Sequence, residues 1–228
     1  MQQRDDDIYA SAPLRRLLDA QTRALEPELQ RCFGSHALLL AATVDDAPPA
    51  LPMLGCWVRL HLAKREYQGD LQASSHEPLP FVDDAFDLVL LRHALECAPI
   101  ASALLAEAIR VLAPGGALAM TGVHPLSGWS PWFRWCSRGR SLALQMPLHL
   151  RHRLFQAGME IERVSRVGNL FPGMTAIDPV ASSWLGGGYV LIARKRRRLV
   201  TPLRLKPVPL RVPANSRLSP GTRRSSAC

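Results

Sequence analysis

The fold is decided by residues 79–125, which read LPFVDDAFDLVLLRHALECAPIASALLAEAIRVLAPGGALAMTGVHP. The apolar run at 88–91 has the length and branching of a strand that is buried on both faces. After Pro99, which suits the first position of a helix, apolar residues recur at helical spacing. Pro114-Gly115-Gly116 ends this helix, and residues 117–123 predict a second strand. Strand, helix and strand together predict a βαβ unit within a parallel sheet.

The flanking sequence extends this α/β pattern on both sides. The expected helices are at residues 13–24, where Pro27 follows as an interruption, and at residues 148–157. The expected strands are at residues 36–42, 58–62, near Asp70, 160–167 and 188–193. We therefore expect a mobile N-terminus over residues 1–11 and one α/β domain over residues 12–196.

The basic character of the chain is concentrated at its C-terminal end. The formal net charge is +9, and 11 of the 28 Lys and Arg residues lie between positions 194 and 228, which contain no acidic residue. The first 193 residues carry 17 basic and 19 acidic side chains, so the expected domain is nearly neutral. Residues 197–228 are rich in Pro, Arg and Ser and predict a disordered tail. Because the tail lacks aromatic side chains for stacking on bases, we expect solvated charge there rather than nucleic-acid binding.

Composition excludes several classes of protein. No apolar stretch approaches the length of a membrane span, and the acidic N-terminus does not resemble a signal peptide. The five cysteines are scattered, odd in number and never in a C-x-x-C pair, which argues against a disulfide framework and against a zinc site. We expect a cytoplasmic protein with reduced thiols and no metal centre.

Three short motifs in a fixed order resemble a known family. Leu79-Pro80-Phe81 is followed by FDLV at residues 86–89 and then by RVLAPGG at residues 110–116. These motifs are similar to the second half of class I S-adenosylmethionine-dependent methyltransferases of the type 11 group. A weaker likeness to bacterial methyltransferase-like proteins extends to about residue 202. The resemblance implies a Rossmann-like sheet that is mostly parallel, has helices on both faces and ends in an antiparallel hairpin.

The resemblance also implies S-adenosylmethionine as the cofactor and indicates where it would bind. Family members have a glycine-rich turn after the first strand, where backbone N–H groups approach the cofactor. In this chain the turn starts at Ala41 and Ala42 and contains no G-x-G. The family's ribose ligand corresponds best to Glu66, and its adenine ligands to Ser75 and His76. All three signatures of cofactor binding are therefore missing or shifted in this sequence.

Arg92 and His93 directly follow the apolar run at 88–91. Ligands of open α/β sheets bind beyond the carboxyl ends of the strands, so both residues are site candidates. By resemblance, Arg92 is a candidate cofactor ligand. His93 is a candidate general base, because histidine titrates near neutrality. Alternatively, His93 fixes the turn through a hydrogen bond. Asp83 and Asp84, beside the LPF motif, are expected to be solvated turn residues.

An aromatic segment, GWSPWFRW at residues 128–135, follows the strand at 117–123. Ser130-Pro131 predicts a helix start. Three interpretations of its tryptophans remain open: a lid over a flat or apolar acceptor, an anchor at a bilayer surface, or ordinary packing over the sheet edge.

The sequence thus predicts a methyltransferase that acts on an unidentified small or lipid-like acceptor. The alternative is a degenerate methyltransferase-fold protein that binds the cofactor poorly and serves as a binding or scaffold module. A third, weaker hypothesis is a nucleic-acid-associated protein that works through its basic tail.

Overall fold

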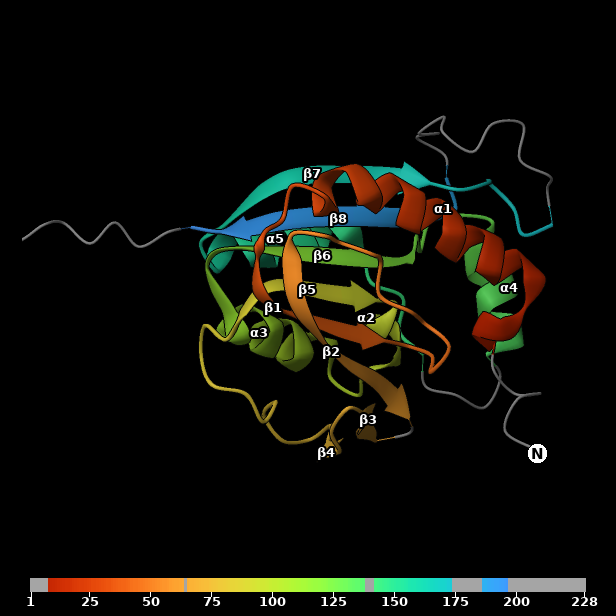
Figure 1. The fold of residues 1–228 in the computed structure, drawn as a ribbon. Helices are drawn as coiled ribbons and strands as arrows, with labels where there is room; N and C mark the ends of the chain where they lie inside the picture. The colour runs from red at the N-terminus through yellow and green to blue at the C-terminus, as the bar shows by residue number, and fades with distance from the viewer. Residues whose placement is uncertain (1–7, 64, 138–141, 174–185, 197–228) are drawn as a thin grey trace, which may run out of the picture. The chain divides into compact units, whose positions relative to one another are not determined.

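One mixed sheet organises the part of the chain that the computed structural model describes, which is residues 8–63, 65–137, 142–173 and 186–196 (Figure 1). Within these ranges the strands follow the order β4-β3-β2-β1-β5-β6-β8-β7. The strands are β1 (Gly34–Ala41), β2 (Leu54–Ala63), β3 (Glu66–Gly69), β4 (Ala73–Ser74), β5 (Phe86–Arg92), β6 (Leu112–Val123), β7 (Met159–Val167) and β8 (Gly188–Lys195). The predicted disordered tail at 197–228 lies outside the described residues.

The centre of the sheet is parallel, as the sequence predicts. β2 pairs with β1, β1 with β5, and β5 with β6, all in parallel register. α3 (Ala101–Val111) provides the crossover between β5 and β6 and is preceded by the short α2 (Ala94–Cys97). Pairing passes from Phe86↔Leu112 directly to Leu88↔Ala117, so the Pro-Gly-Gly segment forms an irregularity inside β6. Gly115 has φ +88° there, a conformation that glycine adopts without steric cost.

Helices cover both faces of the sheet, and the last two strands are antiparallel, which confirms the expected fold class. On one face, Leu25 and Leu29 of α1 (Ala12–Leu29) pack with residues of β1, β5 and β8. On the other face, α3 and α5 (Pro147–Gln156) pack against the same strands. The predicted break at Pro27 is wrong. Pro27 lies in the last turn of α1, where its missing N–H removes a single hydrogen bond.

The first third of the sheet differs from the alternation of strands and helices at its centre. The connection from β1 to β2 contains no helix, and Leu51 from this connection packs against the face that a helix would cover. After β2 the chain turns back into β3, and β3 into β4, and both pairings are antiparallel. Asp70 follows β3 rather than starting a strand, and its carboxylate accepts the Arg59 N–H at 2.8 Å.

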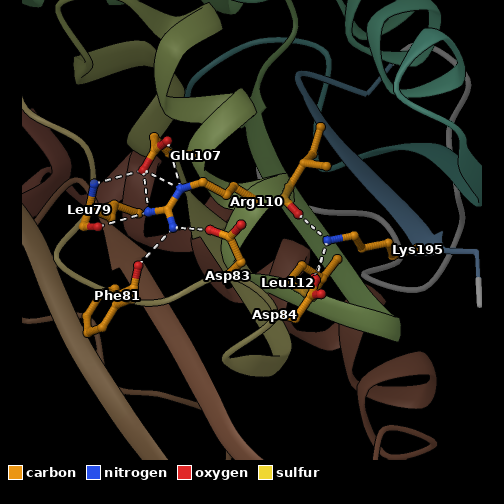
Figure 2. A network of polar contacts seen from close by, with 9 residues as sticks. Leu79, Phe81, Asp83, Asp84, Glu107, Arg110, Leu112 and Lys195 are labelled. Atoms are coloured by element: carbon orange, nitrogen blue, oxygen red, sulfur yellow. Dashed lines mark hydrogen bonds and ion pairs between the residues drawn. The ribbon is translucent and has the colours of Figure 1, made fainter.

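A polar network at the amino edge of the sheet explains the LPF and RVL motifs (Figure 2). The Arg110 guanidinium donates to the carbonyls of Leu79 and Phe81 at 2.9 and 2.8 Å. It also pairs with Glu107 and with Asp83, each at 2.7 Å. These contacts tie the loop before β5 to the end of α3. We call the set Asp83, Asp84, Glu107, Arg110 and Lys195 the amino-edge network.

Asp83 and Asp84 are therefore not merely solvated turn residues. Both are largely exposed, but Asp84 pairs with Lys195 at 2.7 Å, and Lys195 also donates to the carbonyls of Ile109 and Leu112. Asp84 has φ +59°, in the left-handed region that Asp tolerates better than most residues.

Two further expectations concern compartment and membrane. Cys32, Cys56, Cys97 and Cys136 are free thiols, and no helix among the described residues is long and apolar enough to cross a bilayer. The described residues also contain no group of three or more His, Cys, Asp or Glu that would hold a metal ion. A cytoplasmic location remains a prediction.

Candidate functional site at the carboxyl edge of the sheet

The carboxyl ends of β1 and β5 meet side by side. Ala41 and His93 form an isolated bridge beyond the strands, and the Ala42 N–H donates to the Arg92 carbonyl at 2.9 Å. The structure brings these four candidate site residues together. They are joined by main-chain contacts at the edge of the sheet where α/β proteins bind ligands.

Arg92 is engaged with the loop that follows β1. Its guanidinium forms an ion pair with Asp46 at 3.3 Å, and the two side chains are only 10% and 9% exposed. It also donates to the Thr22 hydroxyl of α1 at 2.9 Å and to the Ala47 carbonyl at 3.3 Å. The loop is therefore fastened by a nearly buried ion pair in the place where the family has its glycine-rich turn. This role of Asp46 was not predictable from the sequence, because a carboxylate beside prolines gives no sign of a partner that is distant in the chain.

His93 lies at the centre of a buried network and has no exposed surface. Its Nδ1 lies 2.9 Å from Glu96 Oε2, and its Nε2 lies 2.8 Å from Gln21 Oε1. The Gln21 amide nitrogen donates to two main-chain carbonyls, so its oxygen must act as an acceptor. With the Glu96 carboxyl on the other side, both imidazole nitrogens are occupied by hydrogen-bond partners within the protein.

Tyr9 and Val123 complete the coordination of Glu96. The Tyr9 hydroxyl donates to Glu96 Oε2 at 3.0 Å, and the Val123 N–H donates to Oε1. Burial, followed by the neighbouring Cys97 and Glu96, raises the pKa of Tyr9 well above its ordinary value, so the phenol stays a donor. We call Tyr9, Gln21, His93 and Glu96 the carboxyl-edge network. His93 has φ +55°, and these contacts hold that conformation.

The network favours the second interpretation of His93, in which it fixes the turn, although its partners are side chains rather than a carbonyl. A catalytic role for His93 stays a prediction that would require the network to open. Sequence reasoning missed Tyr9, Gln21 and Glu96, which lie on three separate segments. Residues 8–10 form a short 3-10 helix with Ile8 and Tyr9 buried, so the predicted mobile N-terminus does not extend to them.

The aromatic segment mostly packs over this edge. In α4 (Trp129–Cys136), Trp129 and Phe133 are buried against Tyr9 and Val123, and the Trp129 Nε1 donates to the Asn169 carbonyl at 2.8 Å. These contacts support ordinary packing for Trp129 and Phe133. Trp135 is 60% exposed, so a lid or an anchor at that end of α4 stays a prediction.

The remaining predicted cofactor residues lie elsewhere. Glu66 is exposed at the start of β3, and Ser75 and His76 follow β4. The Ser75 hydroxyl donates to the Arg65 carbonyl at 2.7 Å, which ties together the two ends of the β3–β4 hairpin. β3 is separated from β1 by the whole of β2, which is roughly 10 Å at ordinary strand spacing. Figure 1 shows this hairpin beyond β2, away from the junction of β1 and β5. The structure thus brings together Ala41, Ala42, Arg92 and His93 but not Glu66, Ser75 and His76.

Sequence comparison finds one family model, described as a methyltransferase domain, over residues 43–120. Phthiotriol/phenolphthiotriol dimycocerosates methyltransferase 1 of Mycobacterium ulcerans is 43% identical over 63 residues, which cover 28% of this chain and 23% of that protein. The corresponding enzyme of Mycobacterium tuberculosis strain H37Rv is 38% identical over 63 residues, with the same coverage. The chain thus matches less than a quarter of the length of these relatives.

Structural comparison gives broader coverage at lower identity. A SAM-dependent methyltransferase from Thermotoga maritima superposes with a TM-score of 0.55 at 15% identity, covering 80% of this chain and 90% of that chain. A second, from Archaeoglobus fulgidus, has a TM-score of 0.50 at 13% identity and covers 79% and 94%. At this identity the likeness shows the fold.

Proposed function

We propose that this chain is a class I S-adenosylmethionine-dependent methyltransferase that transfers a methyl group to a lipid-like acceptor; its fold and its match to a methyltransferase-domain model over residues 43–120 support the proposal. The main support for the proposal is the position, within the fold, of the residues that match the methyltransferase-domain model. Residues 43–120 contain the loop after β1, the end of β5 and the crossover to β6. These are the elements whose carboxyl ends form the ligand-binding crevice of such sheets.

The residues at this edge fit one half of the cofactor. S-adenosylmethionine, the cofactor of this family, ends in an amino acid that carries an ammonium and a carboxylate. Asp46 and Arg92 offer the complementary carboxylate and guanidinium within one nearly buried pair. We propose that the pair separates on binding, so that Asp46 holds the ammonium and Arg92 the carboxylate.

The other half of the cofactor has no comparable ligand set. The Glu66 carboxylate accepts from the side chains of Gln68 and Gln72 at 3.4 and 3.3 Å, and Ser75 is bound to the hairpin. The hairpin holds all of these side chains on the far side of β2. We therefore propose weak binding in which the amino-acid end contributes most of the affinity.

Positioning is the contribution that we assign to the protein. The bound cofactor supplies an activated methyl group. Holding the acceptor nucleophile in line with that group supplies much of the rate without a protein base. This agrees with the occupied nitrogens of His93. The lipid-like acceptor rests on the names of the mycobacterial relatives.

Calorimetric titration of the full-length chain with S-adenosylmethionine and with its demethylated product tests the proposal. We expect dissociation constants below about 1 mM, which corresponds to roughly −4 kcal/mol. Asp46→Asn and Arg92→Gln should each weaken binding about tenfold or more, because each removes one charged partner. The exposed pair Arg59–Asp70, 3.5 Å apart, provides matched controls: Arg59→Gln and Asp70→Asn should leave binding unchanged. Equal losses in both sets of variants would contradict the assignment.

A second candidate function is a binding module that has lost efficient cofactor binding. The observation that favours it is the same ion pair, because Asp46 and Arg92 already neutralise each other, and the loop after β1 has no helix. If several millimolar cofactor produced neither a heat of binding nor an increase in melting temperature, this candidate would be supported and the methyltransferase proposal would be refuted.

A further inference from the structure

A groove lies between the start of α5 and the end of β7, on the face of the sheet opposite α1. The groove is lined by Pro147, Leu148 and Arg151 of α5 and by Val164, Arg166 and Tyr189 of the last two strands. His124, just past β6, also lines it. The volume is about 230 Å³, below the roughly 300–1,000 Å³ of pockets that enclose a whole small ligand. The groove is therefore suited to the end of a longer molecule.

The charge in this groove is positive and not compensated. None of the described residues that line it is acidic. The Arg166 guanidinium donates to the carbonyls of Gly186 and Leu126 at 3.1 and 3.4 Å. Within the described ranges, neither Arg166 nor Arg151 has a carboxylate within 4.0 Å. A half-buried cation without a counter-ion costs free energy that an anion would relieve.

His124 adds a neutral donor beside these cations. Its Nδ1 accepts the Leu126 N–H at 3.1 Å, so in the neutral ring the proton is on Nε2. Burial, and secondarily Arg166, lowers the pKa of His124, which keeps the ring neutral at pH 7. An Nε2–H donor and a guanidinium at one end of a groove form a suitable site for a carboxylate.

The remaining surface is apolar and continues along α5. Leu148 and Val164 are 66% and 43% exposed, and Phe155, two helical turns beyond Leu148, is 68% exposed. Residues seven apart lie on the same side of a helix, so Leu148 and Phe155 form one apolar stripe with Arg151 between them. An alkyl chain that extends from the groove would cover Leu148 and Val164.

We propose that this groove, the α5 groove, binds a single-chain anionic amphiphile of the fatty-acid type. The carboxylate lies against Arg166, Arg151 and His124, and the first methylenes lie between Leu148 and Val164. The site is independent of methyl transfer, because it shares no residue with the Asp46–Arg92 pair. A failure of cofactor binding at the carboxyl edge therefore leaves this proposal standing, and the reverse is also true.

Calorimetry of the full-length chain with decanoate, below its micelle concentration, tests the proposal. Decanoate should bind at least about tenfold tighter than 1-decanol, which lacks the charge, and than acetate, which lacks the chain. The proposal is overturned if decanoate binds no tighter than either probe. It is also overturned if no binding is detected at about 1 mM decanoate, near the weakest affinity that calorimetry measures.

Charge reversals on α5 locate the site. Arg151→Glu should weaken decanoate binding about tenfold. Arg153→Glu, the same change two residues along on a part of the helix that does not line the groove, should change it less than about twofold. Both residues are exposed, so both variants should fold. Equal losses in the two variants would mean non-specific attraction to the helix and would refute the groove as the site.

Discussion

The two edges of the sheet differ in how closely their residues resemble the methyltransferase motifs. At the amino edge, the motifs that resemble methyltransferases form the amino-edge network around Arg110, which is entirely structural (Figure 2). At the carboxyl edge, where a ligand would bind, the corresponding motifs are replaced by the Asp46–Arg92 pair and by the carboxyl-edge network around His93. A sequence can therefore keep the motifs that support a fold while changing those that hold a cofactor.

The largest effect should come from the carboxyl-edge network. Glu96→Gln removes the charge that His93 and Tyr9 both face, and it leaves a buried imidazole without its carboxylate. We expect a loss of about 3–5 kcal/mol in the free energy of unfolding, as for other buried pairs that lose one partner. Urea denaturation measures this loss. The exposed Glu77→Gln should be neutral, and a loss below 1 kcal/mol for Glu96→Gln would show that the network contributes little.

A smaller effect should follow at the amino edge. Arg110→Ala removes hydrogen bonds to two carbonyls and two carboxylates, but at a side chain that is 29% exposed. We expect a loss of about 2 kcal/mol, within the range for hydrogen bonds to charged groups, with cofactor affinity unchanged. Urea denaturation and calorimetry check the two parts separately, with the exposed Arg15→Ala as control. If Arg110→Ala abolished ligand binding while stability held, the division between the edges would fail.

The smallest effect should be on how the stability of the protein depends on pH. Hydrogen bonds from Arg110, and next from the Leu79 N–H, lower the pKa of Glu107, against the opposing effect of partial burial. A depressed folded-state pKa stabilises the protein above the unfolded-state value, near 4.3, and this stabilisation is lost as pH falls through the folded-state pKa. Unfolding midpoints between pH 6 and pH 3, roughly the range around that value, should fall less steeply for Glu107→Gln than for the parent chain. Parallel curves would argue against the contribution of Glu107.

Much of the central fold was predictable because it depends on local patterns. The apolar run at 88–91 is buried whatever its neighbours, and the Pro-Gly-Gly segment interrupts any helix. The edge hairpin of β3 and β4 was not predictable, because a four-residue strand such as EYQG gives no periodic signal. The carboxyl-edge network was hidden for another reason: Tyr9, Gln21 and Glu96 are far apart in the chain and individually ordinary.

The sequence by itself predicted the parallel centre, since burial periodicity and turn residues act over short stretches, and the resemblance to a known family predicted the antiparallel end. Only the tertiary structure decided which polar groups meet. The fully buried side chain of His93 contacts Glu96 within its own turn and Gln21 on α1. Arg92 forms an ion pair with Asp46. These contacts exist because the sheet brings three separate segments to one edge. Contacts of that kind depend on distances in space, which spacing along the chain does not encode.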